Sequence, residues 1–347
     1  MLKSGVVFFI YTMAVKFGKT YTSPADIICL LKQRGLQIDD VDSAEHVISN
    51  VGYYRFSAYL YPFLTQPKEL HLFKPSSQFR SALNLYRFDK KLRMFLFNEI
   101  EKIEVSLRST IANVVAEETG NIFWVTDVTM YANREKFNKT MALVDKELKS
   151  SKEDFIKHFK GKYTNDYPPA WMLVEILPLG VVTRIFENIA DNALRKKIAA
   201  RFNLPLPVFS SWITIVTLTR NSCCHHSRVW NKENAITPML LKKSEKPWNS
   251  KSVSPTRVFY NICILKWFID IISPQNDMKG HLKALLAQFP NVDVTAMGFP
   301  ELWENEPLWQ WYKNIKCGCV CVTYPLFLCS VGGGRGGWNY MFFCSSI

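Results

Sequence analysis

The sequence has no hydrophobic run long enough to cross a membrane and no internal repeat. The apolar run Val6–Val15 falls short of the roughly 18 residues that a membrane span needs, and no period of about 20–50 residues indicates a repeat protein. Hydrophobic residues make up 48% of the chain and charged residues 21%, which excludes collagen-like, coiled-coil and largely disordered chains. With 347 residues, the chain can form one large domain or two.

A disulfide framework is also missing. Five of the nine cysteines lie within residues 317–347, and the other four form no evident pairing pattern, which fits a reducing cytoplasm. The closely spaced thiols of Cys317–Cys321 could hold a soft metal. No histidine or second cysteine pair stands at the spacing of a zinc site, so we predict no metal and no cofactor. The four remaining cysteines are Cys29, Cys223, Cys224 and Cys263.

The two ends of the chain differ from its middle. Residues 317–347 are rich in Cys and Gly and have neither helical nor strand periodicity. The start resembles a weak signal peptide, but no small-residue cleavage site follows it, and Met13 offers an alternative start. We therefore expect residues 1–12 to be an N-terminal extension and residues 317–347 to be a non-homologous tail, such as an out-of-frame read-through.

Acidic residues are outnumbered by basic ones. The chain has 30 Asp and Glu against 43 Lys and Arg, a formal net charge of +13. Only Lys3 and Arg335 of these lie in the two ends, so the excess belongs to the middle of the chain. It favours a polyanionic partner, either nucleic acid or an anionic membrane surface, and ordinary surface solvation is the alternative.

Strand signals are few, and the middle of the chain is patterned as helices, so we predict an all-α fold with few or no strands. Ser23, Pro24 and Asp26 are typical of a helix start, and Gly35 is typical of its end. Asp42 is expected to cap the next helix. Further helices are expected at about 78–118, 135–159, 170–177, 181–189, 193–202, 208–230, 257–272 and 275–288.

Two of these regions carry candidate RNA contacts. Segment 53–63 is densely aromatic and contains Arg55; we interpret it as a core helix, with a base-stacking platform as the alternative. The helix at 78–118 has an apolar stripe at three- to five-residue steps. Its other side is expected to be solvated, or partly to line a polar groove. The charged residues of that side include Arg87, Glu101, Glu104 and Arg108.

The most informative stretch is Arg220–Asn231. At about 100° per residue, Asn221, His225 and Arg228 share a face directed away from the apolar side of their helix. An imidazole titrates near neutrality and can move protons. A guanidinium can hold phosphate oxygens and stabilise charge that develops on phosphorus. These groups together favour a phosphodiester site.

The same angles distinguish the two histidines. His226 lies at the edge of the apolar side, so we predict that it is partly packed and that His225 is exposed. On a straight helix Arg220 points about 140° away from His225. A bend at the helix end or a second copy of the chain would then be needed to close the site.

Three other interpretations of this stretch stay open. The histidines could be satisfied core residues. A zinc site is another interpretation, but the four adjacent residues Cys223–His226 cannot all reach one ion from a helix. Either cysteine could instead be a nucleophile, although nothing visible activates it beyond the neighbouring histidines.

Ordered blocks along the chain carry a family resemblance. They are Lys32–Leu36, Val51–Tyr59, Tyr86–Arg93, Ile100–Arg108, Pro169–Met172, Ser211–Trp212 and Arg220–Asn231. In this order they resemble the bacterial Abi-like, or abortive-infection, family of the AbiD/AbiF type, over about Lys19–Trp311. Neither end of the chain is covered.

The resemblance implies a HEPN-like helical bundle with additional helices, which would place an N-terminal helical region at 13–75 and the core at 76–316. HEPN domains include many metal-independent ribonucleases with an Arg-x(4–6)-His motif that works as a pair across two domains or subunits. The motif residues carried over are Arg220, Asn221, His225 and His226, with either histidine able to satisfy the spacing.

The implied function is phage defence through cleavage of RNA in the cytoplasm, with no membrane partner. We expect RNA, a second copy of the chain, and a regulatory small RNA or an antitoxin as partners. A non-catalytic RNA-binding protein is the alternative. The expected RNA contacts are Arg228, Arg55, Arg87 and Arg108, with Glu101 and Glu104 as supporting polar residues.

Overall fold

The structure is a computed structural model, and it describes residues 16, 18, 20–242, 244–250 and 252–310. The chain divides into two compact units, Met1–Trp311 and Tyr312–Ile347, and all described residues belong to the first. The expectations for residues 1–12, for Met13 and for residues 317–347 lie outside the described residues.

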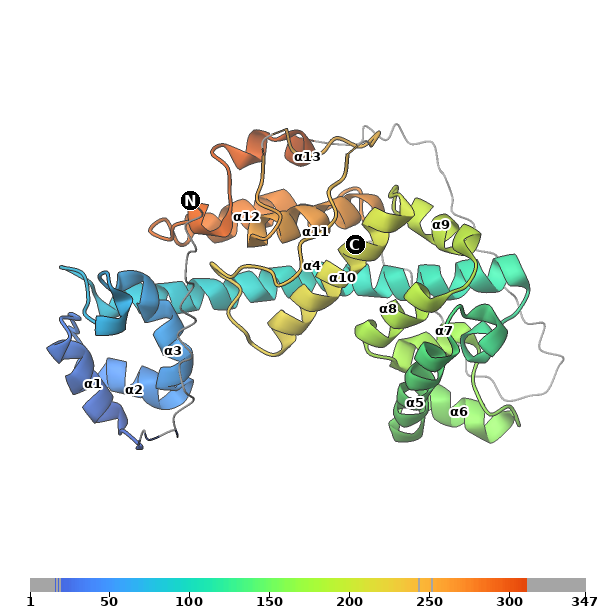
Figure 1. The fold of residues 1–347 in the computed structure, drawn as a ribbon, viewed down its shortest axis with the longest axis horizontal. Helices are drawn as coiled ribbons and strands as arrows, with labels where there is room; N and C mark the ends of the chain where they lie inside the picture. The colour runs from blue at the N-terminus through green and yellow to red at the C-terminus, as the bar shows by residue number, and fades with distance from the viewer. Residues whose placement is uncertain (1–15, 17, 19, 243, 251, 311–347) are drawn as a thin grey trace, which may run out of the picture. The chain divides into compact units, whose positions relative to one another are not determined.

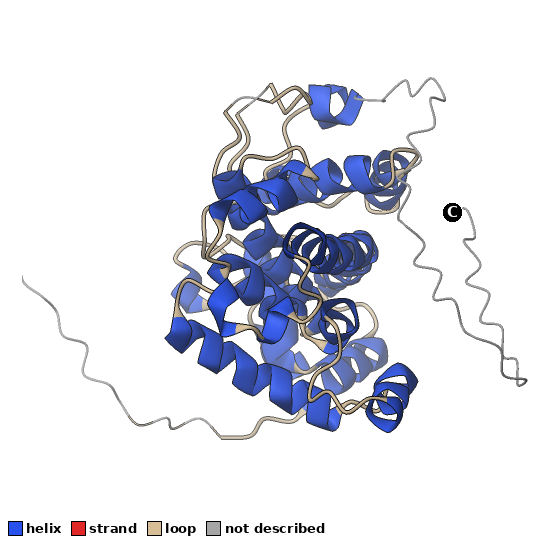
Figure 2. Ribbon diagram, turned by 90° about the vertical axis from the view of Figure 1, so that its right-hand side faces the viewer, coloured by secondary structure: helices blue, strands red, loops and turns tan. Residues whose placement is uncertain are grey.

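Helices dominate the described part of the chain, which contains no strand (Figure 2). The all-α prediction is therefore confirmed. The longer elements are α1 Pro24–Gln33, α2 Val41–Val51, α3 Tyr53–Leu60, α4 Phe79–Thr119, α5 Arg134–Ser150, α6 Asp154–Lys162, α7 Ala170–Leu173, α8 Leu179–Asn188, α9 Asn192–Ala200, α10 Leu206–Cys224, α11 Val258–Ile272, α12 Met278–Ala287 and α13 Pro307–Gln310. Short 3₁₀ helices span Tyr61–Phe63, Lys68–Leu70, Trp124–Thr126, Val128–Met130, Val174–Ile176, Thr295–Met297 and Trp303–Asn305.

Helix α4 is the central element. Its 41 residues correspond to a length of about 60 Å at 1.5 Å per residue. It contacts α3 and α12 as well as α7, α9, α10 and α11 (Figure 1). The apolar stripe is buried, as predicted. Its one difference is at Phe95, which the three-residue step from Leu92 would include: Phe95 is only partly buried, and the neighbouring Leu96 is buried instead. A helix that packs against so many others fixes the positions of residues far apart in the sequence.

Helix α11 is buried on all sides, since 13 of its 15 residues, Val258–Asp270, are inaccessible. A helix that is apolar all round must be enclosed by other elements, and α4, α10 and α13 contact it. Among the described helices, none is both long and apolar enough to cross a membrane.

Helix ends were predicted with mixed success. Ser23 caps α1 and accepts a hydrogen bond from the Asp26 N–H, as expected. Asp42 was the wrong cap for α2, because Asp40 accepts the Ser43 N–H and Asp42 lies in the first turn. The single helix expected at 135–159 is two helices, α5 and α6, since the chain is extended at Ser151 and Glu153.

Candidate functional site

The motif lies at the C-terminal end of α10, where the helix ends earlier than predicted. The last helical residue is Cys224, and His225 is the C-cap, with its N–H donating to the Asn221 carbonyl at 2.9 Å. His226 has a φ of 54°, in the left-handed region that turns the chain away from the helix. The prediction that this helix reaches Trp230 was therefore wrong. We call the segment His226–Trp230 that follows the turn the motif loop.

Asp89 of α4 holds the end of the motif loop. Its carboxylate is fully buried and accepts the backbone N–H groups of Val229 at 3.0 Å and Trp230 at 2.6 Å. Charge-assisted hydrogen bonds of this kind are stronger than neutral ones. These hydrogen bonds join residues 140 and 141 positions apart in the chain. They hold Val229 and Trp230 outside the helix, although the local sequence pattern predicts that the helix reaches Trp230.

The buried carboxylate is itself fully paired. Tyr59 of α3 donates its hydroxyl to Asp89 Oδ2 at 2.5 Å, and Arg93, one turn further along α4, forms an ion pair with the same oxygen. Burial and the adjacent Asp89 charge raise the pKa of Tyr59 well above its ordinary value, so the phenol stays protonated and keeps donating. Groups from α3, α4 and the motif loop thus converge on one carboxylate.

Arginines fix the rest of the motif loop. Two of them donate to carbonyls of the loop backbone, Arg55 to that of His226 and Arg93 to that of Ser227 at 3.4 Å. The third bond runs the other way: Arg228 of the loop donates to the Ala58 carbonyl of α3 at 3.2 Å.

Replacing Asp89 by alanine is expected to destabilise the fold. The change leaves the buried Arg93 guanidinium without its counter-charge and two backbone N–H groups without an acceptor, a loss of about 3–5 kcal/mol in the free energy of unfolding. Urea titration measures it, with Glu135→Ala as control, since Glu135 forms an i,i+4 pair with Lys139 at an exposed site. Equal midpoints for the two variants would contradict the role given to Asp89.

Arg220 lies against α4 through an acidic partner. Its Nε is 3.4 Å from Glu104 Oε2, and the side chain remains 30% exposed. Arg108 donates to the other Glu104 oxygen and, at 2.6 Å, to the Leu177 carbonyl. Glu104 therefore bridges a buried arginine and a partly exposed one. The Arg220 Nε is itself buried and makes no hydrogen bond within the described residues, so a ligand can reach only the exposed part of this side chain.

Both histidines are exposed. This confirms the prediction for His225 and corrects that for His226, which the left-handed turn carries away from the apolar side. Because the His225 N–H still bonds in helical fashion, the angle of about 140° between Arg220 and His225 applies. Within the described residues, no hydrogen bond or ion pair joins Arg220 to either histidine.

The remaining candidates divide by burial. Arg55, Arg87 and Glu101 are exposed and Arg228 is partly so. Arg108 is buried and bonded to carbonyls and Glu104, which gives it a positioning role instead of the RNA contact expected.

The Asp89–Arg93 pair was not predicted as part of the site. Its signal in the sequence was an i,i+4 acid–base pair close to the apolar stripe of α4. Such pairs are common on solvated helix faces, so the pattern alone did not distinguish this buried pair from an exposed one.

The structure disfavours a cysteine nucleophile at Cys223. The side chain is buried, and burial raises the pKa of its thiol to about 12, so the reactive thiolate is scarce near neutrality. No group of three or more His, Cys, Asp or Glu within the described ranges could hold a metal ion.

Thiol labelling tests this assignment. Brief treatment of the folded protein with iodoacetamide at pH 8, followed by peptide mass spectrometry, is expected to modify the exposed Cys29 and to spare Cys223. The buried Cys263, whose pKa burial also raises to about 12, is the matched control. Labelling of Cys223 as fast as Cys29 would show a reactive thiol at the motif.

The fold and site define a helical protein with an Arg–His motif at the end of a core helix. The sequence profile of the Abi-like protein family matches residues 46–231, more than half of the chain, and the chain belongs to this family. The match runs from α2 to just beyond the motif loop, a narrower span than the resemblance over Lys19–Trp311. No curated protein and no solved structure matches the chain.

Proposed function

We propose that this protein acts in abortive infection as a metal-independent endoribonuclease of the HEPN type. Family membership supports the defence role. The observation that carries the enzymatic part is the arrangement at the end of α10. It has an exposed imidazole at His225 and, on the same helix, an Arg220 side chain that Glu104 holds and that remains partly exposed.

The proposed reaction is an internal transesterification of RNA. His225 accepts the proton of a ribose 2′-OH, and the 2′-oxygen attacks the adjacent phosphorus. The bond to the 5′-oxygen of the next nucleotide breaks, and that oxygen takes a proton from an imidazolium. Arg220 stabilises the negative charge that develops on the phosphoryl oxygens. The products are a 2′,3′-cyclic phosphate and a 5′-hydroxyl.

Two copies of the chain fit this chemistry better than one. The reaction needs a proton acceptor and a proton donor, and Arg220 and His225 point about 140° apart on one helix. In a homodimer, the histidine of each copy supplies one of the two proton transfers. We propose such a dimer, with His226 as the alternative to His225 for either step.

RNA binding is assigned to the cations around the motif loop. Arg55 bonds to the loop and Arg228 belongs to it, both retain exposure, and Arg87 is exposed on α4. Phosphate contacts by such side chains add affinity that falls with salt.

Other groups have supporting roles in the proposal. Glu104 and Arg108 orient Arg220. Asn221 acts with Arg220 as a residue of the motif, and the exposed Glu101 is a supporting polar residue. A small RNA or an antitoxin is the proposed restraint on activity in the cytoplasm.

A second candidate function is RNA binding without cleavage. The ion pair between Arg220 and Glu104 favours it, since a guanidinium already paired with a carboxylate offers less charge to a transition state. In that case Arg220 and His225 only hold phosphate.

A time course with labelled single-stranded and structured RNA in EDTA separates these functions. Cleavage that continues in EDTA supports the metal-independent ribonuclease. Binding that weakens with salt, without cleavage, supports the second candidate. If the protein neither cleaves RNA nor binds it in a salt-sensitive way, both candidate functions are contradicted.

A further inference from the structure

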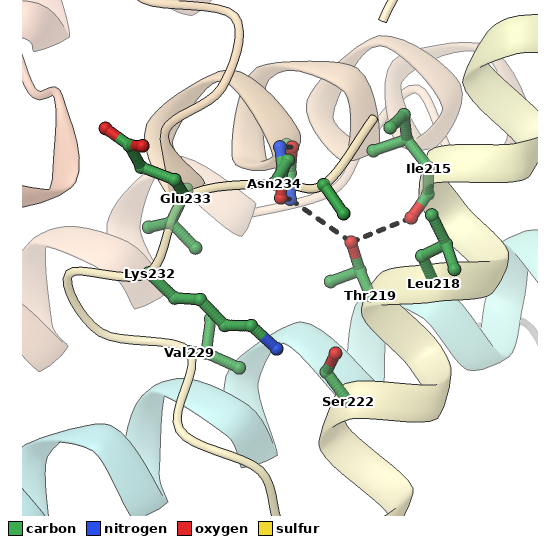
Figure 3. Close-up of a pocket in the computed structure, with 11 residues that line it drawn as sticks. Ile215, Leu218, Thr219, Ser222, Val229, Lys232, Glu233 and Asn234 are labelled. Atoms are coloured by element: carbon green, nitrogen blue, oxygen red, sulfur yellow. Dashed lines mark hydrogen bonds between the residues drawn. The ribbon is translucent and has the colours of Figure 1, made fainter. Parts of the chain in front are cut away.

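A small cavity of about 150 Å³ lies beside the motif, between α10, the segment Val229–Ala235 and the start of α11 (Figure 3). Its walls are mostly apolar, and polar side chains lie at two ends, with Lys232 and Ser222 at one and Asn234 at the other (Figure 3). The residues that form the apolar walls are Ile215, Leu218, Val229, Ala235 and Val258.

The mouth of the cavity carries hydrogen-bond donors. The Lys232 side chain extends across it toward Ser222 of α10 (Figure 3). Within the described residues, neither the Lys232 ammonium nor the Ser222 hydroxyl has a partner. Glu233, also at the rim, pairs with Arg257 at 3.0 Å instead. The mouth therefore presents an ammonium and a hydroxyl, which suit a ligand with carbonyl oxygens.

The inner end of the cavity carries acceptors. Asn234 and Asn261 bond to each other reciprocally, with Nδ2-to-Oδ1 distances of 2.7 and 3.1 Å. Asn261 also donates to the Thr219 hydroxyl at 3.3 Å. Each amide oxygen has two lone pairs and uses one of them to accept a hydrogen bond from the other amide. Both asparagines line the cavity, so each has one further lone pair that can accept a hydrogen bond.

Size and chemistry together select the ligand. A cavity of about 150 Å³ is large enough for benzene, a single six-membered ring, and too small to enclose the two fused rings of a purine. A pyrimidine base can direct its O2 carbonyl, next to the ribose, toward Lys232 and Ser222. Its far side carries an N–H group, N3–H in uracil and N4–H2 in cytosine, that can donate to the amide oxygens.

The position of the cavity relates it to the motif. Ser222 precedes His225 by three residues, and the two directions differ by about 60° on α10, whereas Arg220 faces the opposite side, against α4. Val229 also belongs to the motif loop. A group bound in the cavity would therefore lie next to His225.

We propose that this cavity binds one unpaired pyrimidine base of the RNA. The inference rests on the proposed function insofar as it places that base beside the phosphodiester that His225 acts on. Base recognition here would direct cleavage to single-stranded pyrimidines, since a paired base cannot enter the cavity.

Binding of short single-base oligonucleotides with 2′-O-methyl groups tests the proposal, because these cannot be cleaved by 2′-oxygen attack. The wild-type protein is expected to bind the uridine and cytidine oligomers at least about tenfold more tightly than the purine oligomers, a difference of about 1.4 kcal/mol. Fluorescence anisotropy measures the four affinities.

Two variants locate the effect. Leu218→Trp fills the cavity and is expected to abolish the preference for pyrimidines while leaving the salt dependence of binding unchanged. Lys232→Ala is expected to reduce the same preference. Their controls are Leu72→Trp, at a leucine of similar exposure, and Lys196→Ala, at an exposed lysine of α9. Both controls are expected to keep the preference.

The outcomes separate this inference from the proposed function. Equal affinity of the wild-type protein for all four oligomers, or a preference that survives both cavity variants, overturns the inference even if RNA is cleaved. A pyrimidine preference lost in the cavity variants supports it, even if no RNA is cleaved and the ribonuclease proposal fails.

Discussion

Replacing His225 by alanine is expected to lower the rate of RNA cleavage by about 10²–10⁴-fold, the usual contribution of a positioned general acid or base. The side chain is exposed and makes no hydrogen bond within the described residues, so its removal should leave the fold intact and spare most of the RNA affinity. Single-turnover cleavage of labelled RNA measures the rate, and anisotropy with an uncleavable analogue measures the affinity.

Two other histidines control this experiment. His281 of α12 is exposed and lies outside the motif, so His281→Ala should cleave at the wild-type rate. His226→Ala decides which motif histidine acts. If it loses as much activity as His225→Ala, both imidazoles take part. If His225→Ala is fully active, the assignment of His225 is wrong.

Replacing Arg220 by alanine is expected to reduce cleavage by about 10²–10³-fold, the scale of losing one group that stabilises developing charge. Unlike the histidine variant, it should also bind RNA more weakly, with the slope of log affinity against log salt lower by about one. Glu104→Gln tests how Arg220 is positioned: the neutral amide weakens the 3.4 Å ion pair and should change the cleavage rate more than the affinity. A cleavage rate unchanged in Arg220→Ala would contradict the role given to this guanidinium.

Mixing the two inactive variants tests the dimer. A mixed dimer retains one Arg220 and one His225, whereas dimers of the separate variants lack both arginines or both histidines, so Arg220→Ala and His225→Ala together should cleave faster than either alone. Full recovery is not expected, because each mixed dimer lacks one arginine and one histidine. Activity of the mixture no higher than that of the separate variants, with subunit exchange demonstrated, would contradict a shared site.

Regular elements of this chain follow directly from local pattern. Helix α4 was predicted within one residue at each end, because its apolar positions recur over about eleven turns and no glycine or proline interrupts them. The start of α1 follows from Ser23 and Pro24. In both cases the information lies in residues close together in the sequence.

The end of α10 could not be predicted in this way. It is set by Asp89, which accepts hydrogen bonds from residues 140 and 141 positions later in the chain, and by arginines on α3 and α4 that hold the motif loop. The exposure of His226 follows from this turn. Likewise, Arg108 was expected on the solvated side of α4, yet packing against the 174–177 segment buries it. Contacts of this kind join residues that are far apart in the chain, so no short stretch of the sequence indicates them.

The chemical nature of the RNA ends tests the central claim most directly. Fragments produced by the wild-type protein in EDTA would be separated by liquid chromatography and their masses determined. Proton transfer from a 2′-OH to His225 predicts 2′,3′-cyclic phosphate and 5′-hydroxyl ends, both absent with His225→Ala. Fragments with 3′-hydroxyl and 5′-phosphate ends would contradict the mechanism, because they require attack by water instead of the ribose 2′-oxygen.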